Sequence, residues 1–115
     1  MYRKAYSDIG QDDFATEREN EAMAFDHAIA MMREGEEKGM DSLEAVKAGH
    51  FVRRLWLFLL NDLGSPENGL PDQLRADLIS IGIWALKEVD RIERREVTSF
   101  ADLIDIMQTL RDGLK

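Results

Sequence analysis

Two apolar stretches decide the fold: FVRRLWLFLLNDL at residues 51–63 and LISIGIWAL at residues 78–86. Each is apolar on more of its circumference than a helix needs for one packed face. They are joined by GSPENGLP at residues 64–71, where Gly and Pro interrupt a helix. Helices this apolar need more packing partners than a short chain supplies. The pattern therefore favours a protein that binds another protein over one that carries out chemistry.

Helical periodicity extends outward from these two stretches. A first helix is predicted from about Asp13 to Glu37 and a fourth from near Ser99, because both segments place apolar residues on one stripe. No segment alternates as a strand does. The sequence predicts an all-α, single-domain bundle of about four helices over residues 1–115, with residues 1–10 as a mobile N-terminal arm.

The ends of the two central helices carry recognisable signals. Asp41 and Glu44 form a capping-box pattern, so the second helix is predicted to begin there with Asp41 as its cap. Gly64 suits a left-handed closing turn. Pro71 suits the start of the third helix, because its missing N–H would be unpaired there in any case. In that third helix, Gly82 would let a neighbouring helix approach closely.

Composition limits the possible functions. The chain has 115 residues, a formal net charge of −8 and no cysteine. An acidic chain is repelled by phosphate backbones and anionic lipids, so neither direct nucleic-acid binding nor membrane binding is expected. The longest apolar run, residues 55–60, falls far short of the ~20 residues that span a bilayer. The first eight residues lack the apolar core of a signal peptide, so the expected location is the cytoplasm.

No motif of catalysis or metal binding is present. His27 and His50 lie on different predicted helices without a metal-ligand spacing, and the acidic pairs lie among lysines and arginines. There is no Gly-rich phosphate loop and no nucleophile elbow. We therefore expect no enzyme activity, no metal and no cofactor.

The large apolar residues of the central helices divide into core and surface candidates. Trp56 is favoured as core, whereas Trp84, off the main face of its helix, is equally compatible with core or interface. Leu57 and Ile83 are apolar positions left over once four helices have packed. Phe51 and Phe58 are expected in the core.

Two adjacent arginines lie beside the broadest apolar surface. Arg53 and Arg54 are expected either to bind a carboxylate on a partner or to neutralise Asp62 or Glu67.

Six segments of the chain carry a specific pattern: FVRRLW at 51–56, DL at 62–63, SPENGLP at 65–71, LRADLISIGIW at 74–84, YRKAY at 2–6 and IMQTLRDGL at 106–114. Together they resemble the FlaF family of flagellar biosynthesis regulators. The resemblance covers nearly the whole chain and is most specific between residues 51 and 84.

The resemblance implies a cytoplasmic protein that supports flagellin production or export. Members of the family are thought to act on flagellin itself, as export chaperones do, alongside a separate regulator, FlbT, that acts on flagellin mRNA. Flagellin termini are helical and apolar, and must be kept from assembling before export. This implies a chaperone or adaptor with flagellin as its partner.

The residues and the resemblance together suggest a groove between the second and third helices that holds an amphipathic segment. Its expected contacts are Tyr2, Tyr6, Arg53, Arg54, Leu57, Ile83 and Trp84. The alternative function is translational regulation through flagellin mRNA or FlbT. Both a monomer with an open groove and a homodimer that buries the spare apolar surface are compatible with the sequence.

Overall fold

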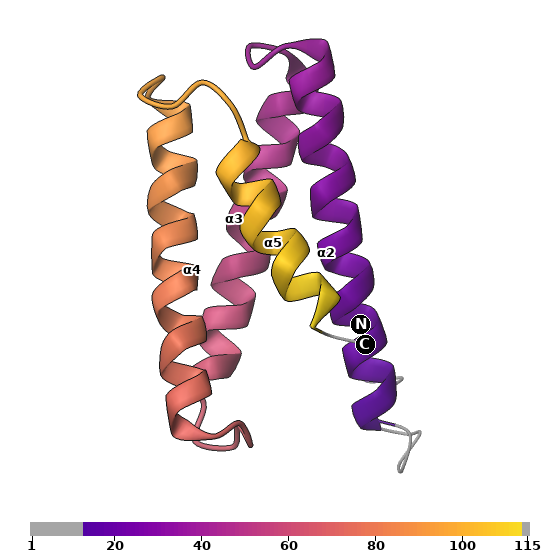
Figure 1. The fold of residues 1–115 in the computed structure, drawn as a ribbon, viewed down its shortest axis with the longest axis vertical. Coiled ribbons are helices and arrows are strands. Elements are labelled where there is room, and N and C mark those ends of the chain that lie inside the picture. Colours follow the sequence, from indigo (N-terminus) through magenta and orange to yellow (C-terminus); the bar gives the residue numbers. More distant parts are fainter. Residues whose placement is uncertain (1–12, 114–115) are drawn as a thin grey trace.

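The computed structural model describes residues 13–113, which form four helices and no strand (Figure 1). The expected N-terminal arm, with Tyr2 and Tyr6, lies outside these residues. The all-α prediction is confirmed within this range. The helices are α2 (Asp13–Lys38), α3 (Leu43–Leu63), α4 (Asp72–Glu93) and α5 (Ala101–Asp112).

Helix α3 occupies the centre of the bundle. Helix α2 packs along one side of it and α4 along another, while α5 packs on α2 and crosses diagonally in front of α3 (Figure 1). The buried core is drawn from all four helices and the residue before α5. Its largest fully buried side chains are Trp56, Phe100, Met32, Leu103, Met107, Val52 and Val89.

Two glycines allow close helix packing. A Cβ on Gly35 of α2 would lie 2.8 Å from the Cα of Ala45 in α3, so the two backbones approach closely there. A Cβ on Gly82 of α4 would lie 2.8 Å from Leu60 Cδ2 and 2.9 Å from Trp56 Cε3. The prediction that Gly82 permits a close approach is confirmed.

The N-terminus of α3 differs from the sequence prediction by one residue. Ser42, not Asp41, is the N-cap: its Oγ accepts a hydrogen bond from the Ala45 N–H at 3.1 Å. The same hydroxyl donates to the Gly39 carbonyl at 2.6 Å, which fixes the preceding turn. The Asp41 carboxylate is instead turned toward the far end of α4, where it pairs with Arg95.

The C-terminus of α3 also differs. Gly64 has φ −82° and ψ −5°, so the predicted left-handed turn is wrong. The chain leaves α3 through consecutive right-handed turns, in which the Ser65 N–H donates to Asp62 O at 3.1 Å and the Asn68 N–H donates to Ser65 O at 3.0 Å. These turns begin directly after α3, so the chain leaves the helix without a residue of positive φ.

The three aromatic residues of α3 were all expected in the core, and the structure confirms this only in part. Trp56 is 1% exposed, which confirms it as core, and Phe51 is half-buried. Phe58 is 42% exposed, so its assignment to the core was wrong. It lies about 200° around the helix from Trp56, and α2 and α4 cover only the Trp56 side of α3.

Helix α5 is held at its start by a contact from α2. Phe100, 1% exposed, precedes its first turn, and the Phe100 N–H donates to Glu36 Oε2 at 2.7 Å. At its other end, Arg111 donates to Asp26 of α2 at 2.8 Å, and this hydrogen bond raises the pKa of Arg111. Both ends of α5 are therefore tied to α2 rather than to α4.

Candidate functional site

Because α4 packs on α3 and α5 packs on α2, a cleft opens between α4 and α5. Its upper part is a hollow of about 640 Å³ and its lower part, floored by α3, a hollow of about 420 Å³, with Thr109 lining both. We call the two together the α4–α5 cleft. The upper part is lined by Ser80, Ile81, Trp84, Asp102, Asp105, Ile106 and Thr109. The lower part is lined by Glu21, Phe25, Trp56, Leu59, Asp62, Leu63, Asn68, Leu70, Leu74, Leu78, Thr109, Leu110 and Gly113.

The walls of the cleft are mostly apolar and its polar lining is acidic. Trp84 and Leu74 of α4 remain 36% and 45% exposed, so apolar surface faces solvent along this helix. Asp102 and Asp105 lie on the α5 side of the upper hollow, and both are exposed. An apolar floor bordered by carboxylates suits an amphipathic segment with basic or neutral polar flanks.

A buried donor lies at the floor of the cleft. Trp56 lines the lower hollow, and its indole N–H finds no hydrogen-bond acceptor among the residues that the structure describes. A buried N–H without a partner costs roughly 1–3 kcal/mol. An oxygen of a bound segment that reached this N–H would remove the penalty.

Of the residues expected to bind a partner, Trp84 lies in the cleft. Ile83, the preceding residue, is 46% exposed, and Leu57 on α3 is 52% exposed. Neither lines the cleft. Ile83 is turned out of it because 100° of helix rotation separates Ile83 from Trp84. The upper hollow lies between α4 and α5, not between the second and third predicted helices. The lower hollow is lined by residues of both α3 and α4 as well as α2 and α5, so it only partly matches the predicted groove. Elsewhere, at Gly82, α3 and α4 pack directly against each other.

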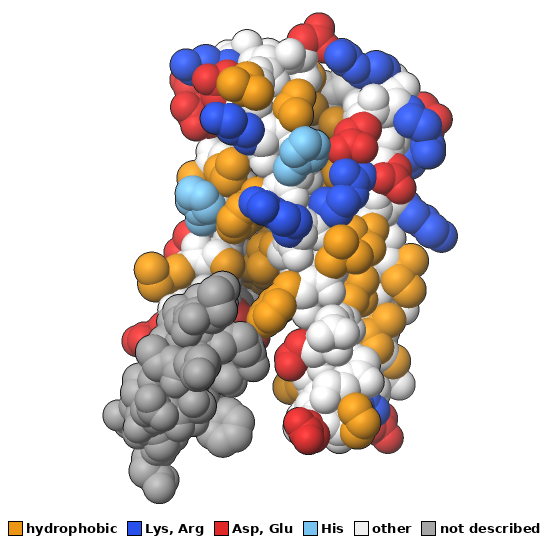
Figure 2. All heavy atoms as spheres, turned by 180° about the vertical axis from the view of Figure 1, so that it is seen from behind, with side chains coloured by type: hydrophobic (Ala, Val, Ile, Leu, Met, Phe, Trp, Pro, Cys, Tyr) orange, Lys and Arg blue, Asp and Glu red, His pale blue; other side chains and the backbone are white. Residues whose placement is uncertain are grey.

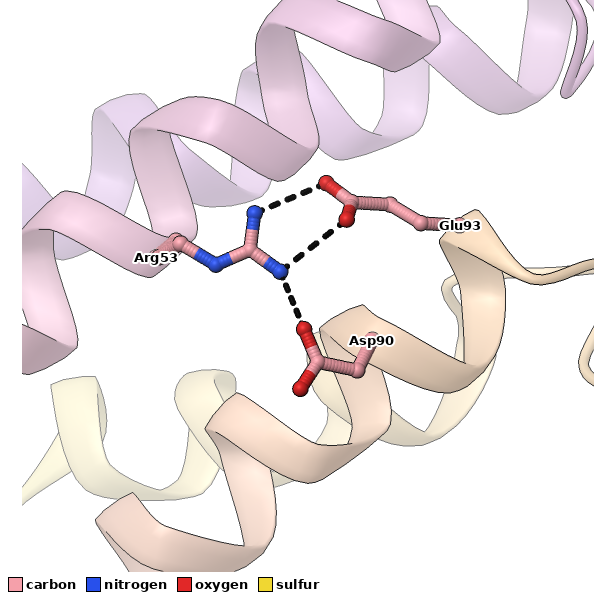
Figure 3. Close-up of polar contacts among 3 residues, drawn as sticks. All are labelled: Arg53, Asp90 and Glu93. Carbon is pink, nitrogen blue, oxygen red and sulfur yellow. Dashed lines mark hydrogen bonds and ion pairs between the residues drawn. The ribbon is translucent and has the colours of Figure 1, made fainter.

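Arg53 joins α3 to α4 instead of projecting into solvent. Its guanidinium donates to both carboxylate oxygens of Glu93, at 2.8 and 3.1 Å, and also to Asp90 (Figure 3). The hydrogen bonds to Glu93 are the main cause that raises the pKa of Arg53, so the side chain stays charged throughout the ordinary pH range. Arg53 was expected to bind a carboxylate either on a partner or within the chain, and it binds carboxylates within the chain. These carboxylates are Asp90 and Glu93, however, not Asp62 or Glu67.

Arg54 is exposed, and the ion pairs to Asp90 and Glu93 come from Arg53 instead. It lines a separate hollow of about 390 Å³ with Met31, Lys47, His50 and Arg53. Asp62, an expected partner of these arginines, is exposed and accepts a hydrogen bond from Asn68 Nδ2 at 3.3 Å.

Sequence reasoning missed the α5 side of the cleft. Ile106 lies outside the buried stripe of α5 and is an apolar leftover of the kind that selected Ile83 on α4. The same criterion applied to α5 would have found it. Asp102 and Asp105 carried no such signal, because acidic residues on a helix surface are ordinary.

With this geometry in view, comparison with known families gives one result. The family model described as Flagellar protein FlaF matches residues 2–114. The chain belongs to the FlaF family. Comparisons with curated proteins and with solved structures give no match. Membership in FlaF makes this a flagellar protein and leaves the partner of the cleft to be proposed.

Two searches of the described residues bear on the kind of site. Among the side chains of residues 19–113, no group of three His, Asp or Glu is placed to hold a metal ion. In the same range, no helix is long and apolar enough to cross a bilayer.

Proposed function

We propose that this FlaF protein is a flagellin-binding chaperone or adaptor that holds a helical terminal segment of flagellin in the α4–α5 cleft. The observation that carries the proposal is the open apolar cleft itself, with Trp84 at its rim and Trp56 at its floor. On α4, the lining residues run from Leu74 to Trp84, about 15 Å at 1.5 Å per residue. This length matches about three turns of a bound helix.

The chemistry of the cleft supports binding rather than catalysis. Its lining provides apolar contact area and a few carboxylates at the edge, the arrangement of a helix-in-groove site. Exposed Trp contributes strongly to such interfaces, because it buries a large area at a small entropy cost. The net charge of −8 weighs against direct contact with flagellin mRNA.

Calorimetric titration of the purified protein with monomeric flagellin tests this proposal. Full-length flagellin and flagellin lacking its C-terminal segment are compared, and labelled flagellin leader RNA is titrated in parallel. We expect micromolar or tighter binding to the full-length protein, weakened by removal of the segment. Binding to RNA alone would overturn the proposal in favour of the alternative, translational regulation through flagellin mRNA. Binding to neither ligand would also overturn it, and FlbT would then be the partner to test.

The adjacent residues Trp84 and Ile83 provide a matched pair of variants. Both side chains are partly exposed on the same turn of α4, but Trp84 alone lines the cleft. We expect Trp84→Ser to weaken flagellin binding about tenfold or more, and Ile83→Ser to leave it nearly unchanged. Circular dichroism of both variants checks that the fold is retained. Equal losses for the two would show that the cleft is not the binding site.

A further inference from the structure

The outward face of α3 is an unusual surface for so acidic a protein. Seven of its residues fall within roughly 100° of arc at 100° per residue, and all seven are exposed. The last of them, Asn61, is neutral. We call the other six the outer stripe of α3: Leu43, Val46, Lys47, His50, Arg54 and Leu57. The two acidic residues of α3, Glu44 and Asp62, fall outside that arc.

The cationic charges of the outer stripe are not neutralised within the described part of the chain. Most arginines there have carboxylate partners, as Arg75, Arg91, Arg94, Arg95 and Arg111 do. Lys47 and Arg54 form no ion pair with any side chain of residues 19–113, the range in which side chains are described. The nearby carboxylates Asp90 and Glu93 are already occupied by Arg53, at the edge of the stripe (Figure 3).

The hollow beside Arg54 concentrates this charge. Its lining residues are Met31, Lys47, His50, Arg53 and Arg54, so no carboxylate borders it. Figure 2, which shows the molecule from behind, has Lys, Arg and His side chains beside hydrophobic ones on this surface. A hollow lined by Lys47 and Arg54, neither of which has an ion-pair partner among the described side chains, binds a carboxylate-bearing partner better than a neutral one.

Apolar residues lie at both ends of the outer stripe. Leu43 and Val46 are 63% and 48% exposed at one end, and Leu57 is 52% exposed at the other. From Leu43 to Leu57 the stripe extends about 21 Å. The order along the helix is apolar, basic, apolar, and a complementary surface would be apolar, acidic, apolar over about four helical turns.

We propose that the outer stripe of α3 is a second docking surface, which binds an acidic amphipathic helix of a partner protein. The partner places Asp or Glu opposite Lys47, His50 and Arg54, and apolar residues opposite the two ends. A second copy of this chain is a poor occupant in a symmetric stripe-to-stripe contact, because that contact would bring like charges together. The stripe is distinct from the α4–α5 cleft, so the proposal stands whether or not the cleft binds flagellin.

The test uses the full-length protein and two labelled helical peptides of 16 residues. One has Leu at both ends and Glu in its central turns; in the other, Lys replaces each Glu. Fluorescence anisotropy is measured at low salt and at 0.5 M salt. We expect the acidic peptide to bind, the basic peptide not to bind, and the affinity to fall at high salt.

Two double variants locate the binding. K47E/R54E reverses the outer stripe, and R33E/K87E reverses two basic residues outside the hollow that also lack an ion pair in the described range. We expect K47E/R54E to weaken peptide binding at least about tenfold and R33E/K87E to weaken it less than about threefold. Absence of peptide binding, or equal losses for the two variants, would overturn the proposal.

Parallel experiments test whether the outer stripe binds something other than a protein helix. Vesicles containing anionic lipid and a single-stranded RNA oligonucleotide are tested with the same variants, and sedimentation velocity tests self-association. Preferential binding of vesicles or RNA that depends on Lys47 and Arg54 would overturn the protein-partner proposal. Self-association abolished by K47E/R54E would overturn it in favour of a homodimer. The flagellin titration with K47E/R54E separates this surface from the cleft, because we expect that variant to retain flagellin binding.

Discussion

Replacing Gly35 with Ala tests how closely α2 and α3 approach. In a helix interior this substitution ordinarily stabilises a protein by about 1 kcal/mol, since Ala has the higher helix propensity. At position 35, however, the new Cβ would lie 2.8 Å from the Cα of Ala45 and 3.2 Å from its N. These are largely backbone atoms, so the two helices must separate locally rather than one side chain rotating away.

The magnitude follows from two opposing effects. Overpacking of a well-packed site costs about 1–3 kcal/mol, and the gain in helix propensity returns about 1 kcal/mol. Because the obstacle is backbone, the cost falls toward the upper part of its range. We expect Gly35→Ala to lower the free energy of unfolding by about 1–2 kcal/mol.

Gly49 provides the control. It is also a buried glycine, within α3, but a Cβ there would meet only Val89 Cγ1, at 3.9 Å. Gly49→Ala should therefore raise the free energy of unfolding by about 0.5–1 kcal/mol. The assay is urea unfolding followed by circular dichroism, with the slope checked for constancy. If Gly35→Ala stabilises the protein as much as Gly49→Ala does, the close approach of α2 and α3 is wrong.

Two further substitutions test the polar contacts of α3. Arg53→Met keeps most of the side-chain stem but removes the ion pairs to α4. Because Arg53 and its partners are partly exposed, we expect the free energy of unfolding in urea to fall by about 0.5–1 kcal/mol. The loss should be smaller in 1 M salt, which screens the charges. An undiminished loss at high salt would mean that packing, not charge, is responsible. Ser42→Ala should cost about 1 kcal/mol by removing the N-cap of α3, and more than Asp41→Ala, whose ion pair is exposed. The reverse order would restore Asp41 as the cap.

Helix positions were predictable from the sequence because apolar periodicity is a local property. The first helix was predicted from a single apolar stripe, and Phe25, Ile29 and Met32 of α2 are indeed buried. Trp56 was correctly assigned to the core. Close packing at Gly82 was also predictable, since a glycine inside an apolar helix has few other uses.

What could not be predicted depends on which helices become neighbours. Phe58 looked like core because α3 is apolar over a broad arc, but α2 and α4 both pack on the other side of that arc. The α4–α5 cleft could not be predicted from the sequence for the same reason: it depends on which helices become neighbours. Its walls come from α4 and α5, and the sequence does not show that both ends of α5 are tied to α2 by Glu36 and Asp26.

The measurement that tests the central claim most directly uses the two tryptophans of the chain as reporters. Their indole N–H groups give two resonances in a ¹H–¹⁵N spectrum: Trp84 reports the rim of the α4–α5 cleft and Trp56 its floor. On addition of a peptide with the sequence of the flagellin C-terminal segment, we expect both resonances to shift, because both tryptophans line the cleft. Binding that leaves both indole resonances in place would contradict the assignment of the cleft as the flagellin site.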